Sequence, residues 1–398
     1  MNLSGREHQE GIAMLGSLPP LRALSSYCLE LSKAIADLSP VEFLSFKKIY
    51  PALLYPGGEL KEDRTFPRLN HPHLRVRRRL TWYNPLTWIF EGVSARGVLL
   101  HAQWWSLPLS VIYIIICLGF RLRGRPVVFT AHNVLSHDRS ALYGIFSRAL
   151  FKLGDHFIVH SAANREQLIS RYGISPERVT RIPHGPLDFH VKDDMERGTI
   201  RNEMGFSPDH RIVLLFGAVR PYKGTDTAIR AFAKVVAKVP TARLVIAGKL
   251  WQSWTEYEKL IESLALKDTV STHLKYIPSD EVHRFFVAAD VAILPYEHFD
   301  AQSGVGATAV SFRKPLIVTD VGGLPELVHD RRFVVPPGDP EALADVIIEA
   351  FENPGILKVM ADGAAQIASK ISWHRIAQNT WTVYEQVLSS KQRHANNR

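Results

Sequence analysis

Cysteine is nearly absent from this chain of 398 residues, which contains only Cys28 and Cys117, far apart and in apolar surroundings. This argues against a disulfide framework or a cysteine metal site and suits a reducing compartment. The 17 histidines are scattered without the spacing of known metal motifs, and no Asp-x-Asp motif follows a predicted strand. We therefore predict that the protein needs no metal and no resident cofactor.

Long apolar runs are also missing. The most hydrophobic segment, residues 107–120, has 14 residues, whereas a helix needs about 20 to span a bilayer. A buried helix is the expected interpretation, and an interfacial helix flanked by Trp105 and Arg121 is the alternative. The first residues show no signal-peptide pattern. These features predict a cytoplasmic protein.

The whole chain has a formal net charge of +9, and its basic residues cluster in the first half. Arginines cluster in residues 75–79 and 121–125, and aromatic residues such as Trp82, Trp88 and Trp105 lie nearby. Such clusters form solvated faces, nucleic-acid patches or contacts with anionic membranes. The aromatic residues favour a membrane over a nucleic-acid duplex. We predict peripheral binding to the inner face of the cell membrane and no nucleic-acid partner, with a solvated face as the plain alternative.

Short apolar runs alternate with helix-length segments in both halves of the chain, the pattern of parallel β-α units. The predicted strands lie near residues 11–19, 41–47, 97–103, 126–133 and 156–161, and then near 211–219, 242–249, 273–278, 290–296, 315–320 and 333–337. Residues 186–210 lose the pattern and are the predicted linker. The fold class is therefore α/β, with two Rossmann-like, doubly wound domains whose carboxyl edges face a central cleft.

Two glycine turns have the sequence of phosphate-binding loops. Ser303, Gly304 and Gly306 stand where a helix is predicted to begin, so free backbone N–H groups and the positive end of the helix dipole would be available there. One such turn is weak evidence, because glycine also marks ordinary turns. Residues 217–224, GAVRPYKG, form a second turn between a strand and a helix. Together they predict a nucleoside diphosphate site.

Several segments of the second half resemble family 4 glycosyltransferases of the GT-B fold. The quoted segments are GAVRPYKG, IAGK, IPSDEVHRFFVAADVAILPY, RKPLIVTDVGGLPELV and VVPPGDPEALADVI. The first half is similar more loosely, through TAHNVLSHD and IVHSAANREQL. The resemblance implies an acceptor-side domain over 1–190, a nucleotide-sugar domain over 205–365, and a closing helix within 366–398 that returns to the first domain.

The resemblance assigns Lys223 to the donor diphosphate, where its ammonium would act as a point charge. A surface lysine at a helix start is the alternative, although the dipole disfavours a cation there. The family usually has an arginine directly after the glycine of this loop, and this chain has Ala218. Arg220 is the predicted replacement, since its guanidinium can bind the same oxygens.

The family also has two glutamates separated by seven residues, one near the donor sugar and one on the ribose. Asp300 and Thr308 stand at those places, so one carboxylate is shortened and the other is missing. Glu297 is an alternative first carboxylate if the loop is longer. The resemblance further implies donor contacts by Ser303, Gly304, Val305, Thr308, Gly323 and Glu326. A dipole-stabilised acid at a helix start is the equal alternative for Glu326.

In the first half, His132 ends a predicted strand, and the resemblance gives such a histidine a role near the sugar and the reaction centre. We predict positioning and charge stabilisation, with a core histidine as the alternative. His101 is a second strand-edge candidate on the acceptor side. Ala23 and Leu24 stand where relatives have glycines, so Ser25 is the predicted cap and acceptor-side candidate. His184 and Gly185 resemble the loop that leads into the linker.

The resemblance implies a metal-independent hexosyltransferase that moves a sugar from a nucleoside diphosphate to an acceptor hydroxyl. The charge pattern favours a glycan or lipid-linked acceptor and a role in cell-surface polysaccharide or glycolipid synthesis. The alternatives are a nucleotide-sugar 2-epimerase of the same fold and a catalytically silent subunit, the latter suggested by Ala218 and Thr308. Donor, acceptor, stereochemistry and oligomeric state are left open by the sequence.

Overall fold

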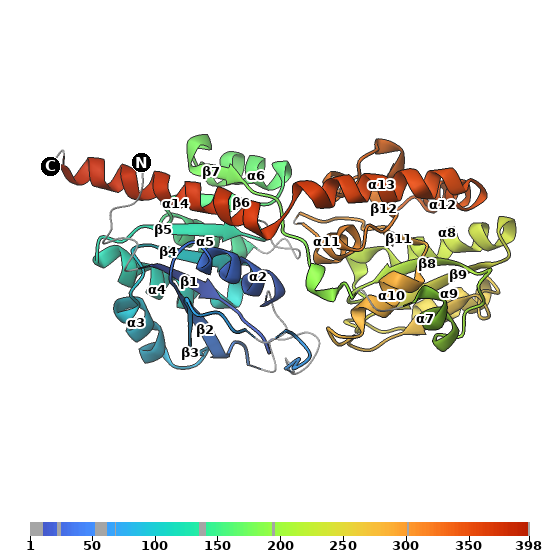
Figure 1. Cartoon of the computed structure of the whole chain (residues 1–398), viewed down its shortest axis with the longest axis horizontal. Helices are drawn as coiled ribbons and strands as arrows, with labels where there is room; N and C mark the ends of the chain where they lie inside the picture. The colour runs from blue at the N-terminus through green and yellow to red at the C-terminus, as the bar shows by residue number, and fades with distance from the viewer. Residues whose placement is uncertain are drawn as a thin grey trace. The chain divides into compact units, whose positions relative to one another are not determined.

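The computed structural model describes residues 11–21, 25–51, 62–67, 69–134, 141–192, 196–300 and 302–396. The chain divides into two compact units, Met1–Gly185 with Ser372–Arg398, and Pro186–Ile371. Each unit contains one parallel β-sheet with helices packed on it (Figure 1). The predicted fold class, two doubly wound α/β units, is confirmed.

The first unit has a seven-stranded sheet in the order β3-β2-β1-β4-β5-β6-β7. Its strands are β1 Ile12–Gly16, β2 Val41–Lys48, β3 Leu74–Thr81, β4 Leu100–Trp104, β5 Val127–Ala131, β6 His156–Val159 and β7 Val179–Arg181. Its helices are α2 Ser25–Ala36, α3 Pro85–Ser94, α4 Ser110–Leu122, α5 Ala141–Phe151, α6 Ala162–Tyr172 and α14 Trp373–Asn396. Alternate residues of β1 enter two different core clusters, so both faces of the sheet are covered.

The second unit has a six-stranded sheet in the order β10-β9-β8-β11-β12-β13. Its strands are β8 Arg211–Phe216, β9 Ala242–Ala247, β10 Val270–His273, β11 Val291–Leu294, β12 Leu316–Thr319 and β13 Val334–Val335. Its helices are α7 Arg197–Glu203, α8 Thr225–Lys238, α9 Thr255–Ser263, α10 Val282–Ala288, α11 Gly304–Ser311, α12 Pro340–Glu352 and α13 Pro354–Lys370. The strand order reverses direction between β8 and β11, which is where doubly wound folds bind ligands at the carboxyl edge.

Sequence reasoning missed an arginine-rich strand. β3 (LRVRRRLT) is absent from the predicted strands, and its arginines were expected only as a charged cluster, but it pairs in parallel with β2. It lies at the edge of the sheet, where charged side chains are tolerated. Arg77 is buried from this strand and pairs with Glu91 at 2.7 Å and with Glu42 at 3.3 Å. One arginine of the predicted surface run is therefore structural.

The predicted linker, residues 186–210, lies entirely within the second unit. The change of unit falls at Gly185 and Pro186, and the chain returns at Ser372. Within the segment, α7 packs against α10, and Arg201 pairs with the buried Asp290 at 2.7 Å. The loss of apolar periodicity here reflects a short helix held by ion pairs.

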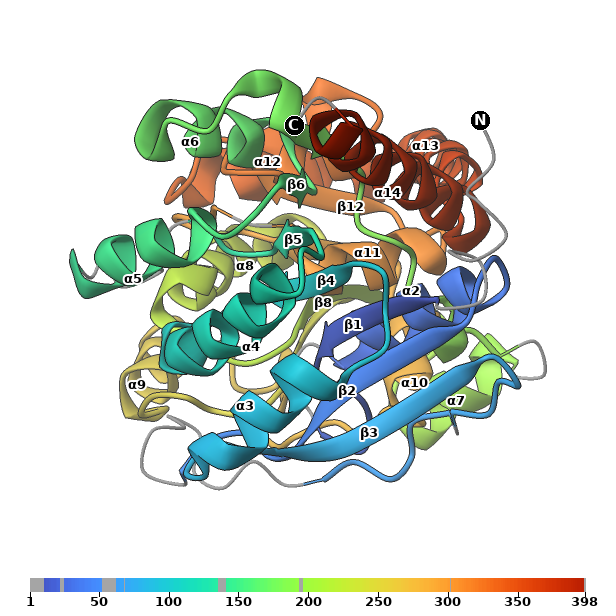
Figure 2. The ribbon, with the colours of Figure 1, turned by 90° about the vertical axis from the view of Figure 1, so that its left-hand side faces the viewer.

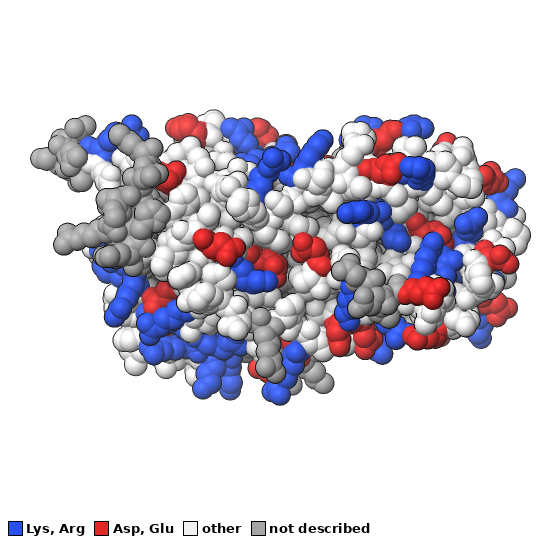
Figure 3. Space-filling model, viewed as in Figure 1, with Lys and Arg blue, Asp and Glu red and all other residues white. Residues whose placement is uncertain are grey.

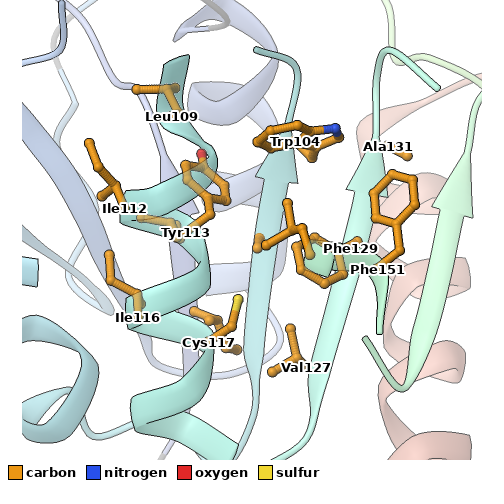
Figure 4. Packing of buried hydrophobic residues seen from close by; sticks show 14 of the residues in the cluster. Trp104, Leu109, Ile112, Tyr113, Ile116, Cys117, Val127, Phe129, Ala131 and Phe151 are labelled. Carbon is orange, nitrogen blue, oxygen red and sulfur yellow. The ribbon is translucent and has the colours of Figure 1, made fainter. Parts of the chain in front are cut away.

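The core of the first unit fixes where β4 and β5 end. Trp104, the last residue of β4, is fully buried, and its ring centroid lies 5.7 Å from that of Tyr113 on α4. Phe129 of β5 contacts Phe151 and Phe157 with centroid distances of 6.1 and 5.8 Å (Figure 4). Because these aromatic rings are closely packed, neither strand can shift along its axis without breaking the contacts.

Helices α3 and α4 lie side by side and touch through glycine (Figure 2). A methyl group on Gly119 would lie 2.6 Å from the carbonyl carbon of Gly92, which is a backbone atom and cannot turn aside. Arg123 then donates to the carbonyls of Gly92, at 2.8 Å, and Ala95. None of the helices in the described ranges is both long and apolar enough to cross a bilayer.

The close contact between α3 and α4 predicts different effects for two matched substitutions. Gly119→Ala should destabilise the protein by about 1–3 kcal/mol because the helices must separate. Gly144→Ala, in α5, meets no atom within 4 Å and should stabilise by up to about 1 kcal/mol through helix propensity. Urea unfolding measures both changes. Equal stability of the two variants would contradict the packing described.

Candidate functional site

In the second unit, the two predicted glycine turns meet at the carboxyl edge of the sheet. Gly217 follows β8 with a φ of 103°, a conformation that favours glycine. A methyl group on it would lie 2.9 Å from both the Lys223 Nζ and the Val305 Cγ2. The turn at 217–224 and the start of α11 are therefore in contact around one lysine.

Lys223 presents a half-buried ammonium that faces an aromatic ring. Its Nζ lies 4.8 Å from the centroid of Tyr296, the residue two positions beyond the end of β11. Desolvation lowers its pKa, and the charge of Arg220 lowers it further. Within the described parts of the chain, no carboxylate lies within ion-pair distance of this Nζ. A cation without an anion in such a place is well suited to bind one.

Arg220 is held against an indole. Its guanidinium carbon lies 3.4 Å from the ring centroid of Trp251, in the loop after β9, and the backbone N–H of Trp251 donates to the Val219 carbonyl at 3.1 Å. Stacking fixes the plane of a guanidinium and leaves its N–H edge available. Arg220 can thus contribute the charge that Ala218 does not.

The start of α11 is built as the sequence predicts. Ser303 caps the helix by accepting the Gly306 N–H at 3.2 Å, and its hydroxyl is 3.3 Å from the Tyr296 hydroxyl. The N–H groups of Gly304 and Val305 occupy the first turn, at the positive end of the dipole. Gly306 serves packing, because a methyl group there would lie 2.3 Å from the Leu327 Cδ1.

The two residues at the predicted carboxylate positions, Asp300 and Thr308, differ in burial and in chemistry. Thr308 is 4% exposed, and its hydroxyl donates to the Gly304 carbonyl at 2.9 Å. The Thr308 hydroxyl can therefore accept a hydrogen bond from a ribose but has no proton left to donate to it. Asp300 is half-buried before α11, whereas Glu297 is exposed. Gly323 and Glu326 lie on the loop after β12, the strand that neighbours β11.

In the first unit, four aromatic or imidazole side chains surround Tyr27 of α2. The ring centroid of Tyr27 lies 4.7 Å from His132, 5.1 Å from His160, 4.9 Å from His184 and 5.3 Å from Trp373. His132 follows the last residue of β5, so it stands at the carboxyl end of its strand as predicted.

These histidines are neutral at pH 7. Burial lowers the pKa of His160 to about 3 and that of His184 to about 4. Burial, followed by the neighbouring histidines, lowers the pKa of His132 well below its usual value. The predicted charge stabilisation by His132 would thus have to come from hydrogen bonding, since an imidazolium is disfavoured here.

Two other predictions for the first unit differ from the structure. His101 is fully buried inside β4, which continues to Trp104, so it does not stand at a strand edge. Ser25 begins α2 and is buried, and its hydroxyl donates to the Ser17 hydroxyl at 3.2 Å. Ala23 and Leu24 lie outside the described residues. Gly185 is required by packing, because a methyl group there would lie 2.3 Å from a Trp373 ring atom.

Sequence reasoning missed the residues that hold the predicted ones in place. They are Gln103, Thr130 and Tyr384 around the histidines, and Trp251 and Tyr296 around the cations. Gln103 and Thr130 carry a sequence signal, because each is a polar residue within a buried strand. In the described ranges, no group of three or more His, Cys, Asp or Glu is arranged to hold a metal ion.

Two family descriptions match the chain. "Glycosyl transferases group 1" matches residues 196–367, and "Glycosyltransferase Family 4" matches residues 25–186. Among solved structures, the chain is similar to HepE of Anabaena in complex with UDP, at a TM-score of 0.72 and 17% identity, covering 94% of this chain and 99% of that chain. The sucrose-phosphate synthase of Thermosynechococcus elongatus is similar at a TM-score of 0.72 and 19% identity, covering 95% and 99%.

Curated relatives are named D-inositol 3-phosphate glycosyltransferase. The protein of Saccharomonospora viridis is 24% identical over 67% of this chain and 66% of its own length. That of a Nocardioides species is 26% identical over 66% of this chain and 62% of its own length. The chain thus spans less than two thirds of the length of these relatives.

The free ammonium predicts how a diphosphate binds. Lys223→Met keeps most of the side-chain volume and removes the charge, so binding of UDP should weaken by about 10–150-fold, the equivalent of a charge-assisted hydrogen bond. The exposed Lys267, changed to Met, is the matched control and should bind as the wild type does. Calorimetric titration measures the affinities. Equal UDP affinity of Lys223→Met and wild type would remove Lys223 from the site.

Proposed function

Because the chain belongs to the family 4 glycosyltransferases of the GT-B fold, we propose that it transfers a sugar from a nucleoside diphosphate to an acceptor hydroxyl. The observation that carries this is the half-buried Lys223 ammonium, which faces Tyr296 without a carboxylate beside the start of α11. Structural neighbours solved with UDP and UDP-glucose support a nucleotide-sugar donor.

In the proposed reaction, the bond between the anomeric carbon and the diphosphate oxygen breaks, and a bond to the acceptor oxygen forms. The acceptor proton passes to the departing phosphate. Negative charge develops on that phosphate, and Lys223, Arg220 and the N–H groups of Gly304 and Val305 stabilise it. This electrostatic work needs groups that are already in place before the reaction.

The remaining donor contacts are inferred from where the candidate residues lie in the second unit. Asp300 and Glu326 would hydrogen-bond the sugar hydroxyls from the loops after β11 and β12. Thr308 leaves the ribose with at most one side-chain contact, because its hydroxyl already donates within α11. The ribose would therefore rely on backbone groups. His132 is a candidate to hydrogen-bond a sugar or acceptor hydroxyl.

A panel of nucleotide sugars tests the proposal directly. The purified chain should release nucleoside diphosphate from one donor, and D-inositol 3-phosphate belongs among the acceptors because relatives are named for it. A lipid-linked glycan extract belongs there too. Recovery of an isomerised nucleotide sugar would favour the 2-epimerase, and tight binding with no turnover would favour a silent subunit. Either result would contradict the proposed transfer.

We also propose that the first unit binds an anionic membrane, which would bring a lipid-linked acceptor to the enzyme. The outer face of α3 is apolar and exposed. Leu86, Ile89, Phe90 and Val93 are each about half or more exposed and recur at helical spacing. Three residues of the adjacent α4 extend this face, and they are Val111, Leu118 and Leu122. Together these seven residues are the α3–α4 apolar face.

Cations border this face. The guanidinium of Arg79 lies 5.6 Å from the ring centroid of Phe90, and the Lys48 Nζ lies 6.0 Å from that of Tyr83. Lysine and arginine side chains gather over β2, β3 and α3 (Figure 3). From Arg64 to Gly154, the sequence has twelve arginines and one lysine but only two acidic residues, Glu91 and Asp138. Apolar residues rimmed by cations are typical of interfacial helices on anionic lipid.

Vesicle flotation tests this surface. Binding should require phosphatidylglycerol and should fall as salt shortens the Debye length from about 10 Å at 0.1 M to about 3 Å at 1 M. Arg75→Ala with Arg79→Ala should weaken binding about thirty-fold, at about 1 kcal/mol per charge.

Leu86→Ser with Phe90→Ser should weaken binding to the same vesicles at every salt concentration. Val359→Ser changes an equally exposed apolar residue of α13 in the second unit and should have no effect. Equal binding to neutral and anionic vesicles, or loss of binding in the Val359 variant alone, would overturn the membrane proposal.

A further inference from the structure

A continuous hydrogen-bonded chain crosses four neighbouring strands of the first unit. His160 Nδ1 lies 2.9 Å from the Ile182 carbonyl, and His160 Nε2 lies 3.1 Å from His132 Nδ1. His132 Nε2 lies 2.9 Å from the Gln103 Oε1, and the Gln103 Nε2 lies 3.1 Å from His101 Nε2. The chain ends where His101 Nδ1 meets the Tyr384 hydroxyl of α14 at 2.6 Å.

We propose that this chain runs in one direction and fixes His132 as a neutral ring with its proton on Nδ1 and a lone pair on Nε2. His160 and Gln103 are then positioning residues for His132. The inference rests on the proposed function only where it says what His132 acts on, since the tautomer itself follows from the contacts.

The Ile182 carbonyl sets the direction. A carbonyl oxygen only accepts, so His160 Nδ1 carries the proton, and in a neutral ring His160 Nε2 is then an acceptor. His132 Nδ1 must donate to it. Because His132 is neutral as well, its Nε2 is left with a lone pair.

The Gln103 amide must match this. A lone pair on His132 Nε2 needs a donor, so the inference requires the amide to be turned by 180° from the contacts given above, with its NH₂ group toward His132 and its oxygen toward His101. The heavy-atom positions are the same for either orientation of the amide. His101 Nε2 then donates to Gln103 and to the Thr130 hydroxyl, 2.7 Å away, and His101 Nδ1 accepts from Tyr384. The one N–H of His101 Nε2 is thus shared between two acceptors, and each of the other contacts in the chain pairs one donor with one acceptor.

The reverse orientation of the amide is costly. With the Gln103 oxygen toward His132, Nε2 would need a proton while Nδ1 keeps its own, and His132 would be a cation. The titratable groups that act on it are His160, His184 and His101, and all of them oppose a positive charge. His132 is 6% exposed, so water cannot offset that cost.

The consequence concerns the proposed transfer. A lone pair on Nε2 at the end of β5 accepts a hydrogen bond from a hydroxyl that displaces the Gln103 amide. A sugar or acceptor hydroxyl would thus donate to His132, and His132 would orient that hydroxyl as a neutral acceptor.

Nitrogen-15 NMR of histidine-labelled protein tests the tautomer without any substrate. Wild-type His132 should show a protonated Nδ1 and an unprotonated Nε2. His160→Gln should preserve this pattern, because a glutamine amide can donate to Ile182 and accept from His132, and it should retain part of kcat. His160→Leu removes the acceptor, so His132 should show mixed tautomers and kcat should fall about 10–100-fold with UDP affinity unchanged.

Two further variants keep the test decisive. His374→Leu alters an exposed histidine of α14 and should change neither spectrum nor kcat. If His160→Leu does not fold, Gln103→Glu places an acceptor-only group beside Nε2 and should raise the measured pKa of His132 by at least one unit. A wild-type His132 protonated on Nε2, or a pKa unchanged in Gln103→Glu, would overturn the inference. If no donor is turned over, the proposed function fails while the NMR result still decides the tautomer.

Discussion

A half-buried ammonium that meets an aromatic ring instead of a carboxylate is the constraint on which the second unit depends. Burying a cation is costly, and the cost is usually offset by an ion pair. Here Lys223 faces Tyr296, and Gly217 can hold its unusual backbone only without a side chain, because Lys223 and Val305 fill the space. The turn, the ring and the start of α11 therefore surround one buried cation, at the place where we propose that the diphosphate binds.

Around His132, the first unit buries neutral polar groups instead of a cation. It brings three imidazoles and a glutamine together from neighbouring strands, where burial disfavours any charge. The solution is a hydrogen-bonded chain in which each buried polar group has its partner, as buried networks require. One unit thus presents fixed positive charge, and the other presents oriented neutral groups.

Much of this could be predicted from the sequence where local chemistry decides the structure. The cap at Ser303, the strand end at His132 and the pairing of two glycine turns all depend on neighbouring residues and on the rule that parallel strands end together. β3 could not be predicted, because its arginines mask a strand that is stable only as the edge of a sheet and with Glu91 opposite Arg77.

Roles that depend on distant contacts were also hidden. His101 was expected at a strand edge, but β4 continues for three more residues and Tyr384, far away in sequence, pairs with it. Trp251 and Tyr296 gave no signal, since an aromatic residue after a strand is usually core. The family resemblance indicated which residues to examine, whereas only the structure showed that Thr308 donates within its own helix.

The most direct test of the account is a crystal structure of the protein with UDP. The account predicts that the diphosphate oxygens lie within hydrogen-bond distance of the Lys223 Nζ and of the Gly304 and Val305 N–H groups, with Arg220 still stacked on Trp251. A diphosphate bound away from α11, or a Lys223 side chain turned away from it, would contradict the account.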